Sequence, residues 1–227
     1  NAPVSKVNRA TTAQSLSVSL TVGAYGIAFG AASVAAGFSI LQTCLLSLLT
    51  FTGASQFALV GILGSGGSAI SGITAASLLG IRNTLYGLRM APVLQSRGWR
   101  RIFAAHLTID ESTGVALSQE ELGTRAMRQG FWLTGAGVFL FWNLFTLAGA
   151  LGAQAIGNPS AWGLDAAVPA AFLGLLWPRL KAKTDRILAL VAGVTALAMT
   201  PYFVPGAPII ATAFLAIAYG LRANLWR

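Results

Sequence analysis

The stretch Gly80-Ile81-Arg82-Asn83-Thr84-Leu85-Tyr86-Gly87-Leu88-Arg89 places a cation and an amide inside an apolar run that begins near Ser68. The run is long enough to cross the hydrocarbon core of a bilayer as a helix. A charged side chain at such a depth is costly unless it faces a partner, a water-filled cavity or a ligand. Small residues on this run allow a second helix or a ligand to approach the backbone: Gly72, Ala75, Ala76 and Gly80. We therefore expect a transmembrane helix that lines a pathway.

The composition indicates an integral membrane protein. Of the 227 residues, 55% are hydrophobic and only 9% are charged. Soluble domains normally carry about 25% charged residues, so a soluble bundle would have almost no polar surface with which to cover this chain. Several apolar runs reach the length of about 18 residues that spans hydrocarbon as a helix. The sequence therefore predicts an all-α, polytopic integral membrane protein, a helical bundle embedded in the lipid bilayer.

The net charge of +9 does not indicate nucleic-acid binding, because the basic residues stand at the ends of apolar runs. This is the pattern of cytoplasmic loops, so segments 97–101, 125–128 and 179–186 and the C-terminus are expected on the cytoplasmic side. The single cysteine and the single histidine, Cys44 and His106, provide neither a disulfide nor a metal-ligand spacing. No active-site arrangement or cofactor motif is found. We expect a protein that is not an enzyme and holds no metal or cofactor.

The apolar runs set the expected organisation. A polar N-terminal tail over residues 1–16 precedes a single transmembrane transporter domain over 17–227. Helices are expected at about 17–38, 40–63, 68–90, 130–153, 162–177, 187–200 and 209–221. Between them, 102–118 is either a short amphipathic helix or a short crossing, and only the former keeps all the basic segments on one side.

The second apolar run is interrupted near its middle by Thr50-Phe51-Thr52-Gly53-Ala54-Ser55-Gln56. Mid-membrane breaks free backbone groups and are tolerated only where they line a cavity or are buried in protein. The segment is therefore a cavity-lining break, or else a kink satisfied by Ser and Thr hydroxyls. The choice also sets the side of the N-terminus. Three full crossings would place Lys6 and Arg9 outside, whereas a re-entrant second run would place them inside.

The two halves of the chain resemble each other. Tyr86-Gly87-Leu88-Arg89 recurs as Tyr219-Gly220-Leu221-Arg222. We expect a first repeat over about 17–90, a connector over 91–130 and a second repeat over about 131–222. Transporters built from two repeats with broken or re-entrant helices hold their ligand between the repeats. The paired broken segments are expected at 50–56 and near Pro169.

Three motifs, taken in order, resemble those of a known family. Gly53-Ala54-Ser55-Gln56-Phe57 is similar to a glycine-alanine-serine-glutamine-phenylalanine signature. Arg82 with Tyr86-Gly87 is similar to an asparagine-x-arginine-histidine…tyrosine-glycine motif, with Gly80 and Asn83 in place of the asparagine and the histidine. Thr108-Ile109-Asp110-Glu111 resembles a threonine-aspartate-glutamate motif. The family is AzlC, the branched-chain amino acid permeases that confer azaleucine resistance, and the resemblance covers nearly the whole chain.

The resemblance implies the larger subunit of a two-component exporter in the bacterial cytoplasmic (inner) membrane. Its substrates would be leucine, isoleucine, valine or analogues such as azaleucine. Its partner would be a small AzlD-type membrane subunit. The sequence leaves open whether the chain also forms a homo-oligomer. We expect a secondary transporter that works by alternating access and is driven by the proton-motive force. The alternatives are a channel-like pore for a small solute and a non-transporting membrane subunit of a complex.

The candidate substrate-binding residues are the polar and glycine positions of the break and of the central stretch: Thr52, Gly53, Ser55, Gln56, Arg82 and Asn83. A guanidinium binds a carboxylate bidentately, so Arg82 is expected to hold the carboxylate of an amino acid. The alternatives are that Arg82 snorkels to an interface or pairs structurally with Asp110 or Glu111. The polar side chains of the break either bind the charged groups of the substrate or form interhelical hydrogen bonds.

The candidate proton-coupling residues are His106, Asp110 and Glu111. A proton-driven exporter needs a carboxylate that loads and releases a proton within the membrane. His106 lies four residues before Asp110, so the two would share a face if both stood on one helix. The alternative is a salt bridge between these acids and the arginines of 97–101 on a solvated face.

Overall fold

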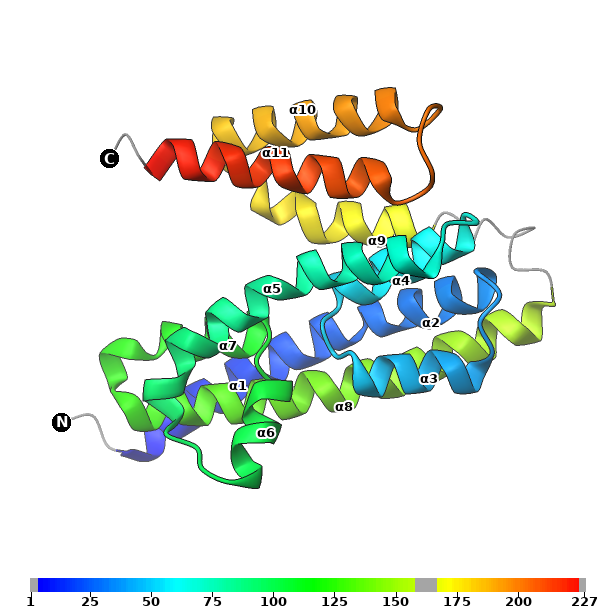
Figure 1. Ribbon diagram of the computed structural model, residues 1–227. Helices are drawn as coiled ribbons and strands as arrows, with labels where there is room; N and C mark the ends of the chain where they lie inside the picture. Colours follow the sequence, from blue (N-terminus) through cyan, green and yellow to red (C-terminus); the bar gives the residue numbers. More distant parts are fainter. Residues whose placement is uncertain (1–3, 158–166, 225–227) are drawn as a thin grey trace.

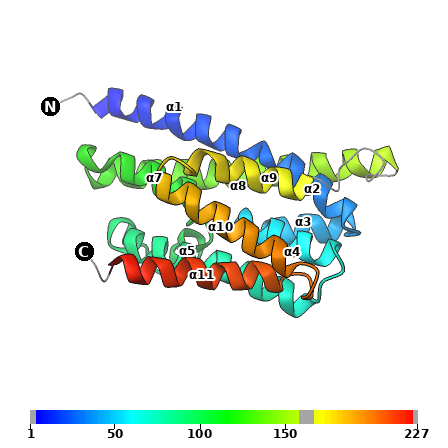
Figure 2. The ribbon, with the colours of Figure 1, turned by 90° about the horizontal axis from the view of Figure 1, so that it is seen from above.

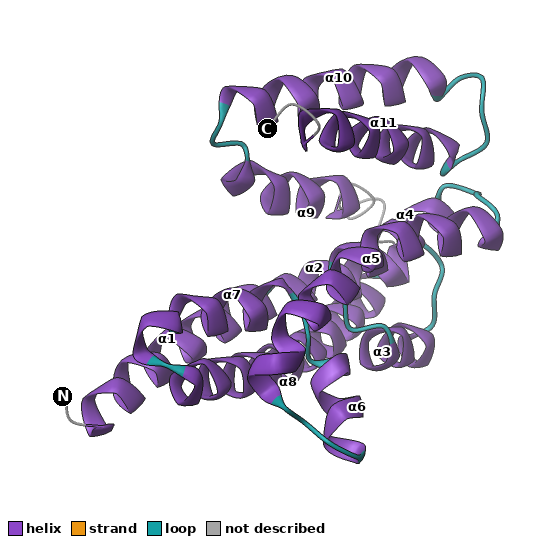
Figure 3. Ribbon diagram, turned by 60° about the vertical axis from the view of Figure 1, so that its left-hand side comes forward, coloured by secondary structure: helices purple, strands orange, loops and turns teal. Residues whose placement is uncertain are grey.

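The computed structural model describes residues 4–157 and 167–224 (Figure 1). Every regular element in these ranges is helical, which confirms the all-α prediction (Figure 3). The elements are α1 (Val4–Gly23), α2 (Tyr25–Ala35), α3 (Ile40–Leu49), α4 (Ala54–Gly64), α5 (Ala69–Leu94), α6 (Trp99–His106), α7 (Asp110–Ser118), η1 (Glu120–Leu122), α8 (Thr124–Ile156), α9 (Ala167–Leu176), η4 (Trp177–Arg179), α10 (Lys183–Met199) and α11 (Ala207–Asn224). By length and composition, two helices are able to cross a membrane: 9–35, which joins α1 to α2, and α8.

The centre of the bundle is a parallel pair formed by α8 and the α1–α2 rod. Gly23 lies against Phe141, and Gly30 lies against Thr146 and Ala150, so the two rods run in the same direction (Figures 1 and 2). The α1–α2 rod begins at Val4, well before the apolar run, because the polar first turns of α1 form hydrogen bonds with the connector over 91–130. There the Thr11 hydroxyl donates to Gln119 Oε1 at 3.0 Å, and Thr11 is fully buried.

The contact between α2 and α8 depends on residues without side chains. A Cβ at Gly149 would overlap the carbonyl oxygen of Ile27. We expect Gly149→Ala to lower the unfolding temperature in detergent, because overpacking of this kind costs about 1–3 kcal/mol. Gly152→Ala is the matched control on the same helix, since its Cβ would meet no atom within 4 Å and alanine favours a helix. Equal unfolding temperatures for the two variants would contradict this account of the packing.

The second apolar run is a re-entrant hairpin. α3 begins shortly after α2 ends, and the last residue of α4, Gly64, lies against Ala36. The outer ends of α3 and α4 are therefore at the same end of the bundle, and the break between the helices lies at its middle (Figure 1). This geometry confirms the predicted break. It also puts the N-terminus at the end of the bundle where α5 finishes, as a re-entrant run requires (Figure 2).

The basic segments of the chain gather at that same end. It holds the N-terminus, the start of α8, the start of α10 and the end of α11 (Figure 1). α10 and α11 form a hairpin that leaves this end and returns to it, and α11 also contacts α5. One end of the bundle is thus basic and the other is nearly free of ionisable residues within the described ranges.

The second half of the chain follows the path of the first. α9, α10 and α11 take the directions of α3, α4 and α5 (Figure 1). One expected detail is different. Pro169 stands in the first turn of α9 rather than at a break within it, a position where the missing N–H of proline leaves no hydrogen bond unmade. The start of the fifth apolar run, expected at 162–177, lies outside the described residues.

Candidate functional site

A cavity of about 190 Å³ lies at the middle of the bundle, where the broken helices meet. Five of the residues singled out in the sequence line it: Thr52, Gly53, Arg82, Asp110 and Glu111. They come from three separate motifs, on the α3–α4 break, on α5 and on α7. The rest of the wall is mainly apolar and includes Val22, Leu79, Val138, Trp142 and Phe172.

The break between α3 and α4 is built around Gly53 and Gln56. Gly53 has φ +63° and ψ −90°, a conformation that glycine adopts without strain. Gln56 Oε1 accepts a hydrogen bond from the Gly53 N–H at 3.2 Å, and its Nε2 donates to the carbonyls of Leu46 and Ser47 at 3.2 and 3.3 Å. The side chain is 1% exposed. Gln56 therefore holds the freed backbone groups of the break and positions Gly53, and does not line the cavity itself.

The other two residues expected from the break have separate roles. The Thr52 hydroxyl donates to the carbonyl of Thr50 at 3.0 Å while the residue lines the cavity. Ser55 is buried at the contact of α4 with α5, where a Cβ at Gly80 would lie 3.6 Å from its hydroxyl oxygen. Ser55 does not line the central cavity, and its buried hydroxyl has no hydrogen-bond partner among the described residues.

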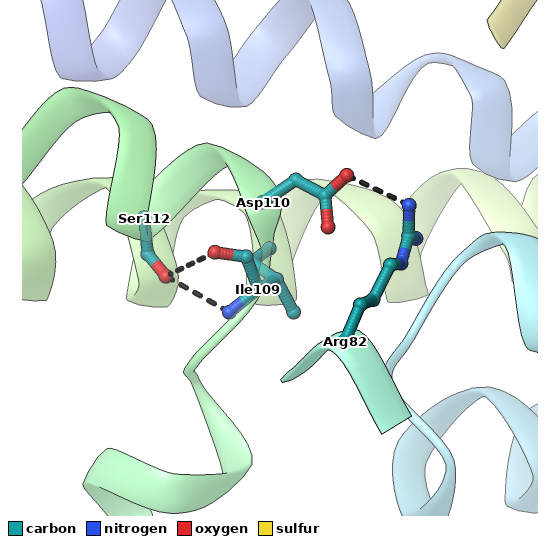
Figure 4. A network of polar contacts seen from close by, with 4 residues as sticks. All are labelled: Arg82, Ile109, Asp110 and Ser112. Atoms are coloured by element: carbon teal, nitrogen blue, oxygen red, sulfur yellow. Dashed lines mark hydrogen bonds and ion pairs between the residues drawn. The ribbon is translucent and has the colours of Figure 1, made fainter. Parts of the chain in front are cut away.

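The segment 102–118 forms neither the single amphipathic helix nor the crossing that its sequence suggests. It breaks at Leu107–Ile109, between the end of α6 and the start of α7. Ser112 secures the start of α7. Its hydroxyl accepts from the Ile109 N–H at 3.1 Å (Figure 4) and donates to the Leu107 carbonyl at 2.6 Å. Asp110 and Glu111 form the first turn of α7, where the helix dipole favours negative charge. The cavity therefore receives the N-terminal end of α7.

Arg82 and Asp110 form an ion pair at this cavity. Arg82 Nη1 donates to Asp110 Oδ2 at 2.9 Å (Figure 4), and the side chains are 32% and 13% exposed. The expected structural pairing of Arg82 is thus present. Because a guanidinium carries five donors, this one contact leaves Arg82 the capacity to hold a second carboxylate.

Two broken helices present their N-termini to the cavity, α4 directed toward one end of the bundle and α7 toward the other (Figure 1). The N-terminal end of a helix carries a partial positive charge that favours anions. With Arg82, these ends suit a carboxylate, and Asp110 and Glu111 suit an ammonium group. The cavity is therefore complementary to a zwitterion. The acids at 110 and 111 were the sequence signal for the start of α7, as acidic residues favour the first turn of a helix.

His106 and Asn83 lie away from this constellation. His106 ends α6, so the expectation that it shares a helical face with Asp110 is wrong, because the break at 107–109 separates them. Its ring packs against Phe51 and Phe139, with centroids 5.9 and 5.5 Å away. Asn83 lines a different cavity, between α5 and α6. Within the described ranges, no three side chains of His, Cys, Asp or Glu gather to hold a metal ion.

Comparison with known proteins agrees with this picture. The model of the AzlC protein family matches residues 17–156, which contain every lining residue of the central cavity except Phe172 and Leu176. A protein of Archaeoglobus fulgidus, described as an uncharacterized membrane protein, is 32% identical over 190 residues, covering 82% of this chain and 81% of the relative. No solved structure matches the chain.

Proposed function

The chain belongs to the AzlC family of membrane proteins, and from this premise we propose that it is a secondary transporter that exports branched-chain or similar small aliphatic amino acids. One observation supports the proposal most directly. A single mid-bundle cavity is lined by a guanidinium, two carboxylates and an otherwise mainly apolar wall. The charged groups suit the zwitterionic head of an amino acid, and the apolar wall suits an aliphatic side chain.

An aromatic cluster forms and supports the apolar part of the cavity wall. Phe29 and Phe57 meet edge to face with centroids 5.5 Å apart, and Trp142 packs against both of them at 6.1 and 6.3 Å. Trp142 and Phe172 reach the cavity itself. A packed, mainly apolar wall of this kind binds an aliphatic side chain through burial. A polar side chain would therefore lose its hydration there, which favours aliphatic substrates.

Energy coupling is proposed at the same site. Asp110 and Glu111 are the candidate proton carriers, because both are carboxylates at the cavity in the first turn of α7. Proton binding by Asp110 would weaken its ion pair with Arg82 and so link proton movement to the state of the substrate site. His106, half-buried at the end of α6 and packed against aromatic rings, is proposed to act only through the packing of Phe51.

The proposed membrane placement follows the distribution of charge. The basic end of the bundle, with both termini, would face the cytoplasm of a bacterial cell. Export would then carry substrate from this end to the other. We also propose a small AzlD-type membrane subunit as partner, in the lipid bilayer.

Counterflow of radiolabelled leucine in proteoliposomes tests the function, with and without a co-expressed small membrane subunit. We expect saturable exchange that isoleucine and valine inhibit. Uptake that rises linearly with concentration, with no stimulation by leucine on the far side, would indicate a channel instead. No flux of leucine, isoleucine or valine in either preparation, with folded protein shown by its unfolding transition, would overturn the proposed substrate class.

A further inference from the structure

A second cavity, of about 590 Å³, lies between α5 and α6. Its α5 side includes Asn83, Thr84 and Gly87, and its other side includes Arg101 of α6 and Thr108 of the α6–α7 break. Of the basic residues in 97–101, two lie on α6 and one lies in the loop that joins α5 to α6. This loop follows the end of α5 that lies at the basic end of the bundle. The second cavity is therefore on the side of the central cavity that faces the basic end of the bundle.

The linings of the two cavities come from neighbouring residues of the chain. On α5, Arg82 lines the central cavity and the next residue, Asn83, lines the second one. Along the α6–α7 break, Thr108 lines the second cavity, whereas Ile109 and Asp110 line the central one. The two linings thus adjoin on two segments of the chain, and the 2.9 Å bond between Arg82 and Asp110 joins these segments.

We propose that the second cavity is the vestibule through which an amino acid reaches the central cavity, and that the Arg82–Asp110 ion pair is the barrier between the two. The ligand class rests on the proposed function, whereas the path rests on the geometry alone. The vestibule has the matching chemistry. Arg101 supplies a cation for a carboxylate, and the apolar residues Leu88, Met90 and Leu94 border the space for an aliphatic side chain.

The barrier is suited to opening by its own ligand. Removing one partner of an ion pair in a low-dielectric site is costly, because the remaining charge is left uncompensated. The carboxylate of an arriving amino acid replaces that of Asp110 on Arg82, so the guanidinium exchanges one carboxylate for another. In this exchange the Asp110 carboxylate moves from the guanidinium of Arg82 to the ammonium group of the same ligand or to a proton. A solute without a carboxylate makes no such exchange, and the barrier stays closed to it.

A pair of matched glycines tests the vestibule by obstruction. Gly87 lines it, and a Cβ there would meet no atom within 4 Å, so the side chain of Gly87→Leu starts in open space and extends into the cavity. Gly220 stands in the same four-residue motif on α11, and a Cβ there also meets no atom within 4 Å. Both changes replace glycine by a better helix former. We expect Gly87→Leu to reduce leucine counterflow at least about tenfold and Gly220→Leu to leave it unchanged.

Cysteine labelling tests the path without reference to any substrate. Cys44 is the single cysteine of the chain, so Cys44→Ala gives a background for Thr84→Cys in the vestibule and Leu79→Cys in the central cavity. A membrane-impermeant thiol reagent is added to the basic side in oriented vesicles. We expect it to label Thr84→Cys readily and to label Leu79→Cys only after Asp110→Asn has removed the ion pair.

The outcomes separate this inference from the proposed function. No labelling of Thr84→Cys from the basic side would show that lipid or protein covers the second cavity, and would overturn the vestibule even if leucine counterflow is observed. Equal labelling of Leu79→Cys with and without Asp110→Asn would overturn the barrier. Labelling as expected, in a protein that exchanges no aliphatic amino acid, would support the path and overturn only the proposed substrate class.

Discussion

Arg82→Ala is expected to reduce leucine counterflow at least about tenfold, which corresponds to about 1.4 kcal/mol of lost substrate or transition-state binding. Arg82 is the guanidinium that lines the central cavity, and its partner Asp110 is only 13% exposed. Alanine removes the donor for a substrate carboxylate and the ion pair with Asp110. Arg125→Ala is the matched control, because Arg125 is exposed in the first turn of α8. Equal activity of the two variants would rule out Arg82 as a substrate contact.

Two further variants separate binding from structural pairing at Arg82. Arg82→Lys keeps the charge but not the planar fork of donors, so we expect a raised KM for leucine with a nearly unchanged unfolding temperature. The exchange of Arg82→Asp with Asp110→Arg restores an ion pair with its cation on α7. It is expected to recover part of the unfolding temperature, since a cation in the first turn of α7 opposes the helix dipole, and not the counterflow. Recovery of both would mean that Arg82 acts only through its pair with Asp110.

Local chemistry made the broken α3–α4 segment predictable from sequence. Thr50 to Gln56 interrupts an apolar run, and its glycine and amide are what a mid-membrane break requires. The structure adds how the amide is used. Gln56 binds Gly53, Leu46 and Ser47, so its importance lies in the geometry of the break. Sequence alone cannot tell a ligand-binding amide from one that satisfies the backbone, because both require the same donors and acceptors.

The α6–α7 region was less predictable, because its fold depends on distant contacts. The pair Asp110–Glu111 indicates a helix start, yet the four-residue spacing from His106 indicates a continuous helix. Tertiary contacts decide between the two. Arg82, on α5, binds Asp110, and Ser112 secures the new helix start. The side of the N-terminus was open for a similar reason, since it depends on whether α4 returns to Ala36 rather than on composition.

Gly53→Ala is expected to abolish most leucine counterflow and to lower the unfolding temperature. With φ +63° and ψ −90°, an L-residue at this position is strained by about 1–3 kcal/mol. Space is not the obstacle, because the nearest atom to the new Cβ is Trp142 Cη2 at 4.0 Å. The strain is relieved by a change of the backbone at the break, which would move the Gly53 N–H away from Gln56. The N-terminus of α4 would then no longer point at the cavity.

Gly66→Ala separates the loss of stability from the loss of the site. Gly66 has φ +82° in the turn between α4 and α5, where a Cβ would meet no atom within 4 Å. Alanine at this position would also be strained by its positive φ, but at the end of the re-entrant hairpin rather than at its tip. Both variants are expected to unfold at lower temperature, and only Gly53→Ala should lose transport below that temperature. A parallel loss of transport in both would mean that the hairpin tolerates no strain anywhere, and that the position of Gly53 at the cavity carries no separate role.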